Sequence, residues 1–276
     1  MASVVYILGR AFGYGPQFVG LALIFSGLMS FVSYWNSDKI ILGLSGARPA
    51  SRNDNFVFYT ATENLALAAQ LPMPKLYVID DSAMNAFATG RDPEHAVVCA
   101  TTGLLARLNR TEIEAVIGHE LSHIRFYDMR LMSLVTVMVG TVTLMADWAI
   151  RTRCFGGRRK NSEEGQLQAL LLLLGIFMVL LSPLIANLIK LAISRRREFQ
   201  ADAGSVMLTR QPEGLISALK KLDADKEPLE AANKATAHLY ISDPLKNLKH
   251  SVGWFAGLFD THPSIVDRVS ALEKMK

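Results

Sequence analysis

Cysteine is scarce in this chain of 276 residues, and its scarcity excludes several kinds of protein. With only Cys99 and Cys154 present, the chain can form neither a framework of several disulfides nor a thiolate cage around a structural metal. It also lacks a glycine-rich phosphate loop, an internal repeat and a low-complexity tract. The sequence therefore argues against a disulfide-stapled domain, a cysteine zinc finger, a P-loop nucleotide-binding protein and a repeat protein.

Charged residues are almost missing from three long stretches of the chain. Residues 17–35 and 167–189 carry none, and residues 131–150 carry a single aspartate. Each stretch is close to or longer than the roughly 20 apolar residues that span the hydrocarbon core of a bilayer. Buried helices of a soluble protein are the alternative interpretation. Because all three lengths match a bilayer, we expect an integral membrane protein.

The charged residues that are present are nearly balanced, with 29 Lys and Arg against 25 Asp and Glu. Basic residues gather beside the apolar stretches, for example in the run from Arg195 to Arg197. Such clusters are typical of contact with anionic lipid headgroups. We therefore expect a lipid bilayer as a partner and no nucleic acid. Polar residues do not recur along the apolar stretches as a translocation path would require, which argues against a transporter.

A His-Glu-x-x-His motif, His119 to His123, lies in a strongly helical part of the chain. Residues four apart share one helix face, so His119 and His123 can bind one zinc ion. Glu120 points to the side, where it can reach a metal-bound water. Zinc lowers the pKa of such a water to about 7, and a carboxylate can take its proton as the water attacks a peptide carbonyl. The motif predicts one zinc ion per chain, with Glu120 as the general base.

A solvated polar helix face is the alternative explanation of the motif, but the flanking residues favour the metal site. Thr111 to Glu114 has the pattern of a capping box, which predicts a helix that begins just upstream. An apolar stripe follows, with both histidines away from its centre. The stripe consists of Ile113, Val116, Ile117, Leu121 and Ile124.

A site of this type needs a third protein ligand, which leaves the fourth position for water. Glu198 and Asp202 are four apart in a helical stretch and hence on one face. Glu198 is the natural donor, with Asp202 orienting an imidazole through its other ring nitrogen. An ion pair between Glu198 and the nearby arginines explains the same residues equally well. His262 can donate to the oxyanion of a tetrahedral intermediate, or it can be an ordinary surface histidine.

Three short extended runs precede the motif, at residues 75–79, 85–89 and 95–102, and they predict a small antiparallel sheet. The edge of a sheet leaves backbone groups unpaired, and a substrate peptide can add to them as an extra strand. We expect the edge at residues 97–101, with Val97 and Val98 contacting the substrate. An ordinary core strand is the alternative.

In combination these motifs resemble the HtpX-type membrane zinc metalloproteases, a family related to the CAAX prenyl endopeptidases. The resemblance covers the chain from about Gly13 onward. It is carried by Asn85 to Gly90, Thr101 to Leu105, the zinc helix, Glu198 to Asp202, and His262 to Arg268. It implies that Glu198 is the third zinc ligand and that Asn85 contacts the substrate. By the same resemblance, His262 and Arg268 bind the substrate or stabilise the transition state.

The resemblance also implies a function in membrane-protein quality control and the stress response. Such proteases cleave misfolded or damaged membrane proteins, with the catalytic domain on the cytoplasmic side of the cell membrane. A catalytically inactive membrane adaptor that only holds zinc is the alternative, and the intact Glu120 argues against it. A prenyl-protein processing enzyme would need more membrane spans than this chain offers.

The expected fold is an integral, multi-pass α-helical membrane protein with an α+β zincin-like catalytic domain, built from a small antiparallel sheet and zinc-binding helices. We expect four segments: an N-terminal membrane segment at residues 1–36, the first part of the catalytic domain at 37–130, a transmembrane hairpin at 131–193, and the second part of the domain at 194–276.

Overall fold

The computed structural model describes residues 31–137, 195–229, 236, 239–241 and 263–276, together with positions 24 and 28. Most of the expected hairpin at residues 131–193 lies outside these ranges, as do most of the N-terminal segment and His262. Within the described ranges, every helix is too short or too polar to span a bilayer. The division of the chain into four segments stays a prediction.

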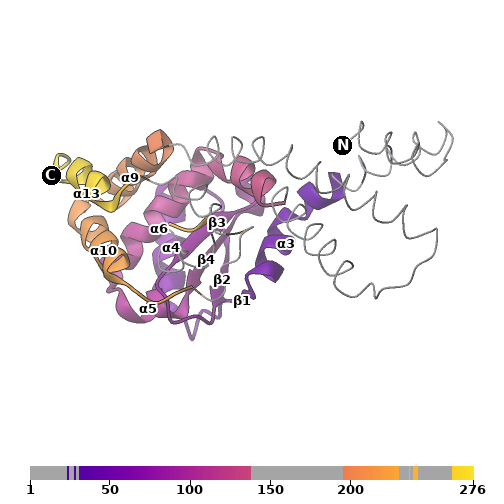
Figure 1. The fold of residues 1–276 in the computed structure, drawn as a ribbon, viewed down its shortest axis with the longest axis horizontal. Coiled ribbons are helices and arrows are strands. Elements are labelled where there is room, and N and C mark those ends of the chain that lie inside the picture. Colours follow the sequence, from indigo (N-terminus) through magenta and orange to yellow (C-terminus); the bar gives the residue numbers. More distant parts are fainter. Residues whose placement is uncertain are drawn as a thin grey trace, which may run out of the picture.

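A four-stranded mixed sheet lies at the centre of the described domain (Figure 1). Its strands are β1 (Arg48–Pro49), β2 (Lys75–Ile79), β3 (Ala86–Thr89) and β4 (Val97–Thr101). Their spatial order is β1-β2-β4-β3. Strand β4 is parallel to β2 and antiparallel to β3. Strand β4 therefore lies between β2 and β3 in the sheet.

Two predictions about this sheet are wrong. The sheet is mixed and not antiparallel, and β4 is a central strand and not an edge. Val97 pairs with Lys75 on one side and with Thr89 on the other. Val97 and Val98 are each 1% exposed, so a substrate strand has no free backbone to pair with there. All five residues of β4 are buried, and a strand that is apolar on both faces is best buried in the middle of a sheet.

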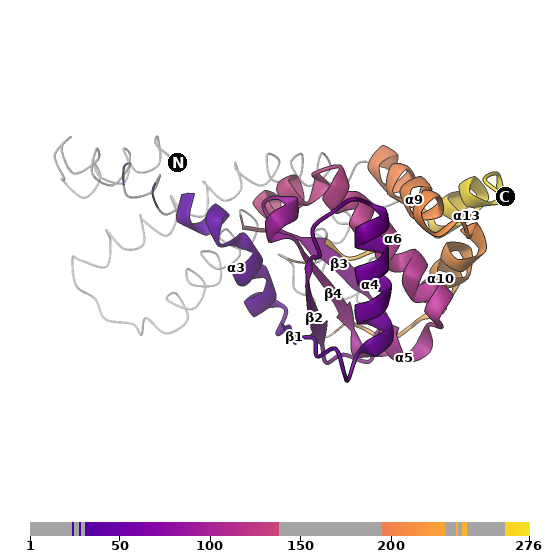
Figure 2. The ribbon, with the colours of Figure 1, turned by 180° about the vertical axis from the view of Figure 1, so that it is seen from behind.

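Helices cover one face of the sheet. Side chains alternate along the strands, and one set packs against α4 (Phe56–Ala68), α6 (Arg110–Arg125) and α10 (Pro212–Ala224). Figure 2 shows α4 lying across the strands. The strand residues of this face are Leu76, Val78, Ala86, Ala88, Val98 and Ala100.

A second, smaller core covers the opposite face. There Phe87 and Cys99 pack with Ile41 of α3 (Ser37–Leu44), Met132 and Tyr240. The sheet is therefore buried on both sides, and its accessible backbone is confined to its edges. On the side of the sheet next to α6, the edge strand is β3.

Helix α6 carries the His-Glu-x-x-His motif and begins with a capping box, two residues before the predicted one. Asn109 Oδ1 accepts the backbone N–H of Glu112 at 3.0 Å, and the Glu112 carboxylate accepts the Asn109 N–H at 2.8 Å. Glu114 instead pairs with Arg110 at 2.9 Å. Asn109 is the N-cap of α6 because α5 (Thr102–Arg107) ends just before it and because Asn is a strong N-cap residue.

Glu112 also connects α6 to α10, and its replacement is expected to destabilise the fold. Its carboxylate accepts hydrogen bonds from Ser217 at 2.6 Å and Lys221 at 2.7 Å. Burial opposes the charged form, but the hydrogen bonds from Lys221, Ser217 and Asn109 hold the pKa of Glu112 below its ordinary value. The stabilisation is thus present at neutral pH and is lost as the pH falls through that lowered pKa.

We expect Glu112→Gln to lower the free energy of unfolding by about 1–3 kcal/mol at pH 7, because a charged hydrogen-bonded group and half of the cap are lost. Denaturation of the variant and the parent at pH 7 and at acid pH would measure this. The difference should shrink in acid, where the parent carboxylate is also neutral. Equal stability at pH 7 would contradict the assigned role.

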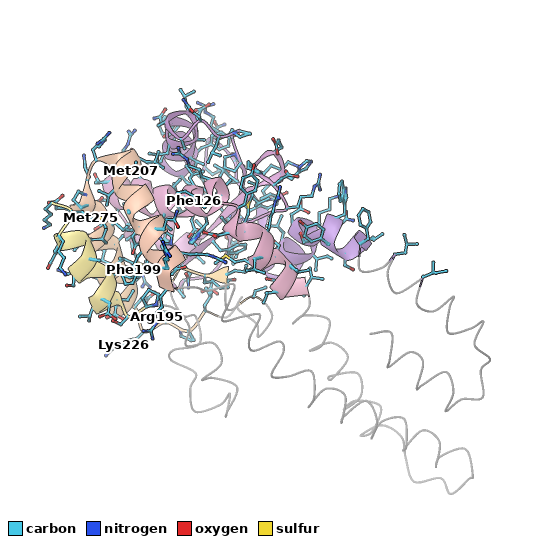
Figure 3. The ribbon with its side chains drawn as sticks, turned by 90° about the horizontal axis from the view of Figure 1, so that it is seen from above. Phe126, Arg195, Phe199, Met207, Lys226 and Met275 are labelled. Carbon is cyan, nitrogen blue, oxygen red and sulfur yellow. The ribbon has the colours of Figure 1, made fainter. Side chains whose placement is uncertain are left out.

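Small residues let α9 (Arg195–Thr209) cross α6 at close range. A Cβ added to Gly204 would lie 2.2 Å from the Ser122 hydroxyl oxygen, and one added to Gly118 would lie 3.0 Å from that of Ser205. The Ser205 hydroxyl donates to the carbonyl of Ala115 at 2.6 Å. In Figure 3, Arg195 and Met207 mark opposite ends of α9. This close crossing brings residues of the second half of the chain against the His-Glu-x-x-His motif of the first.

Candidate active site

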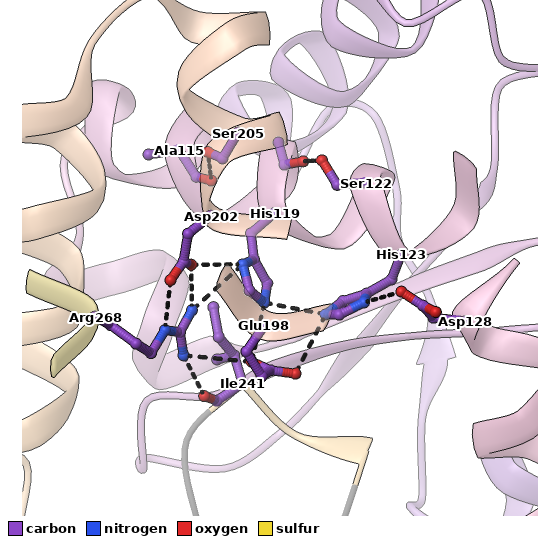
Figure 4. A network of polar contacts seen from close by, with 11 residues as sticks. Ala115, His119, Ser122, His123, Asp128, Glu198, Asp202, Ser205, Ile241 and Arg268 are labelled. Atoms are coloured by element: carbon purple, nitrogen blue, oxygen red, sulfur yellow. Dashed lines mark hydrogen bonds and ion pairs between the residues drawn. The ribbon is translucent and has the colours of Figure 1, made fainter. Parts of the chain in front are cut away.

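The donor atoms of His119, His123 and Glu198 converge on one point inside the domain (Figure 4). One donor atom from each residue lies within 4.8 Å of the others. The two Nε2 atoms are 3.2 Å apart, and each is 3.6 Å from an oxygen of Glu198. The side chains are 1%, 4% and 1% exposed. The three residues predicted as metal ligands are therefore brought together by α6 and α9.

A carboxylate stands behind each histidine ring. Asp202 Oδ1 lies 2.9 Å from Nδ1 of His119, and Asp128 Oδ2 lies 3.2 Å from Nδ1 of His123. A carboxylate on Nδ1 holds the ring proton there and turns the Nε2 lone pair toward the common centre. The sequence predicts this role for Asp202 but not for Asp128. The sequence signal that could have identified Asp128 is a carboxylate five residues after His123.

Arg268 of α13 (Ile265–Glu273) closes the network from a third element. It donates to both oxygens of Asp202, from Nε at 2.9 Å and from Nη2 at 2.6 Å. Its Nη1 lies 3.6 Å from Glu198 Oε2 and donates to the carbonyl of Ile241 at 3.3 Å. The guanidinium is fully buried, so it fixes the position of Asp202. Its predicted contact with substrate stays a prediction.

The charges in this cluster fit a bound cation. Burial lowers the pKa of His119 and favours the neutral imidazole that a metal needs. Burial acts the same way on His123, but Asp128, Glu198 and Glu120 outweigh it and raise the pKa of His123 to about 9. The surrounding carboxylates thus attract positive charge to this point. Two imidazoles and one carboxylate, all three buried, are a donor set that suits zinc.

Glu120 lies beside the three donors and is not among them. Burial, with the nearby Glu198, raises the pKa of its carboxyl to about 7, against the opposing effect of His123. A hydrogen bond from the backbone of Ala88 in β3 holds the carboxylate. A raised pKa makes this carboxylate a stronger proton acceptor than an ordinary glutamate, which suits a general base.

The remaining predicted residues are placed as follows. Asn85 lies just before β3, buried, with its Oδ1 accepting the N–H of Ala86 at 3.1 Å. Its contact with substrate stays a prediction. Val97 and Val98 lie inside the sheet and away from its edge. His262 lies outside the described residues.

The close crossing of α6 and α9 gives a test of this geometry. We expect Gly204→Ala to lower zinc affinity by about 10-fold or more, because its Cβ would force α9 and Glu198 away from the histidines. Zinc content after dialysis against a mild chelator would measure it. Gly43→Ala is the matched control, since nothing lies within 4 Å of its Cβ. Equal zinc retention in both variants would contradict this account of the crossing.

Two histidines on one helix, a glutamate from a second helix, and a further glutamate outside this donor set define the class of this protein as a metallopeptidase. The chain belongs to peptidase family M48, whose family model matches residues 58–276. The protein is accordingly a metalloendopeptidase.

Several curated relatives are similar over nearly the whole chain. A "Protease HtpX homolog" of Streptococcus equi subsp. equi is 42% identical over 99% of this chain and 91% of the relative. One of Lactiplantibacillus plantarum is 43% identical over 100% of this chain and 95% of the relative. The predicted resemblance to HtpX-type proteases is confirmed.

A solved structure shares the fold. The crystal structure of S. mikatae Ste24p matches with a TM-score of 0.53 at 19% identity. The match covers 98% of this chain and 62% of that one. At this identity the likeness concerns the fold alone.

Proposed function

We propose that this metalloendopeptidase uses zinc and cleaves misfolded or damaged membrane proteins at the cell membrane. The observation that carries the proposal is the convergence of His119, His123 and Glu198, with Glu120 nearby and outside the ligand set. Zinc held by the three ligands would supply a Lewis acid that acidifies a water molecule.

The other residues of the site have separate tasks in this proposal. Glu120 accepts the proton of the attacking water and passes it to the leaving amine. The backbone of Ala88 keeps its carboxylate aimed at the reaction site. Asp202 and Asp128 hold the imidazole rings in the orientation that metal binding needs, and Arg268 holds Asp202 in place.

Substrate binding is assigned to the edge of β3, which replaces the predicted edge at β4. Strand β3 pairs with β4 on one side only and runs beside α6. Main-chain pairing along such an edge reads little side-chain sequence. It therefore suits an enzyme whose substrates share an unfolded backbone and no common sequence.

The described surface supports a position at the membrane. Several large apolar side chains before and within α3 are exposed: Phe31, Val32, Trp35, Ile40 and Leu44. The Arg91 guanidinium lies 4.4 Å from the ring centroid of Trp35, and that of Arg130 lies 4.4 Å from that of Tyr127. Aromatic rings beside arginines are common at the level of lipid headgroups.

The function is tested by incubating detergent-purified protein with an unfolded substrate protein. Cleavage should stop on zinc chelation and return on adding zinc. Intact substrate under both conditions would favour the zinc-holding adaptor, the alternative function.

A labelling experiment tests the orientation and the hairpin at residues 131–193. Cys99 is fully buried, so an impermeant thiol reagent should not reach it. We expect Cys154 to be labelled only from the outer face of sealed membranes. In a Cys154→Ser background, Leu67→Cys on α4, where Leu67 is 81% exposed, should be labelled only from the cytoplasmic face. Labelling of both from one face would contradict a hairpin that crosses.

A further inference from the structure

Ile241 of this chain contacts the outer edge of β3, which is the edge that does not pair with β4. Its N–H donates to the carbonyl of Ala86 at 3.0 Å, and its carbonyl accepts from Arg268 Nη1 at 3.3 Å. That same nitrogen lies 3.6 Å from Glu198. Figure 4 shows the carbonyl of Ile241 beside Arg268 and close to Glu198. Both main-chain groups of one residue are thus held next to the metal ligands.

Tyr240 and Ile241 alternate across the edge as two residues of an added strand would. The Tyr240 ring meets the Phe87 ring edge-on, with centroids 5.2 Å apart, in the core on one face of the sheet. Ile241 belongs to the core on the other face, with residues of α4, α6 and α10. Both side chains are almost fully buried. The segment therefore fits the edge through its side chains as well as its backbone.

Most edge groups of β3 that a substrate would need have partners within the chain. The N–H of Ala86 is held by Asn85 Oδ1, its carbonyl by Ile241, and the backbone of Ala88 by Glu120. A strand offers its outward groups at every second residue, so Ala86 and Ala88 form the edge nearest the metal site. A substrate strand that pairs with Ala86 must therefore use the carbonyl that Ile241 now occupies.

We propose that Leu239 to Ile241 is an autoinhibitory segment that substrate must displace from the edge of β3. The proposal rests on the proposed function and deepens it. Ile241 stands in for a substrate residue, with Ala86 holding its N–H and Arg268 its carbonyl. Because the bound segment reduces the fraction of competent enzyme, it weakens the apparent affinity for substrate.

Variants that weaken the contact of residues 239–241 with β3 provide a kinetic test. Ile241→Pro removes the N–H that Ala86 accepts, and Tyr240→Ala removes the ring against Phe87. We expect each variant to lower KM for an unfolded substrate about fivefold, the effect of one hydrogen bond or packing contact, with little change in kcat. Glu112→Gln is the control, because it loosens the fold away from the edge and should leave KM unchanged. An unchanged or higher KM in both variants of the segment would overturn the proposal.

Hydrogen exchange gives a readout that does not depend on turnover. Zinc-loaded Glu120→Gln protein should hold an unfolded substrate without cutting it. We expect the amides of residues 239–241 to exchange faster when that substrate is bound, because they have left β3. Unchanged or slower exchange with bound substrate would overturn the proposal while leaving the endopeptidase function intact. Failure of the wild type to cleave would instead count against the proposed function.

Discussion

Glu120→Gln is expected to abolish peptide hydrolysis while zinc binding persists. Glu120 is not among the three converging donors, so its loss leaves the ligand set complete. The amide of Gln has nearly the shape of the carboxylate and can still accept from the backbone of Ala88, but it takes no proton from water. Losing a general base costs about 10²–10⁴-fold in rate. The same group also serves the leaving amine, so we expect the upper end of this range.

Two measurements on one preparation check this result: zinc content by metal analysis and cleavage of an unfolded substrate. Glu114→Gln is the matched control, because it makes the same change on the same helix at a partly exposed ion pair with Arg110. It should keep both properties. Near-normal cleavage by Glu120→Gln would refute the assigned role and the mechanism built on it.

Replacing the two acids of α9 should separate the ligand from the residue that orients it. We expect Glu198→Gln to lose zinc to a mild chelator, because only two histidines remain as ligands. Asp202→Asn should keep zinc, with affinity or turnover reduced about 10–100-fold. The asparagine keeps an oxygen for Arg268, which is buried and donates to both Asp202 oxygens.

The choice of asparagine over alanine follows from that arginine. Asp202→Ala would leave the buried Arg268 guanidinium without its main partner, at a cost of about 3–5 kcal/mol. Zinc lost from such a variant would report unfolding and not ligation. Circular dichroism on each variant separates the two effects. Retention of zinc by Glu198→Gln together with its loss from Asp202→Asn would show that the two roles are reversed.

Local rules in the sequence determined which candidate donors share a helix face, and the family resemblance selected Glu198 as the third ligand. The spacing of His119 and His123 fixes their common helix face, because an α-helix repeats every 3.6 residues. The same periodicity put Glu198 and Asp202 on one face of a second helix. The structure joins these two helices without altering either pattern.

Other features were decided only by tertiary packing. The position of β4 depended on how much apolar surface both of its faces could bury, which no local turn signal encodes. Asp128 reaches His123 because the chain turns after α6, and Arg268 reaches Asp202 because α13 packs beside α9. Ile241 lies on β3 through one backbone hydrogen bond between residues far apart in the chain. Periodicity determines which residues share a face of one element, whereas contacts between elements follow from the packing of the whole domain.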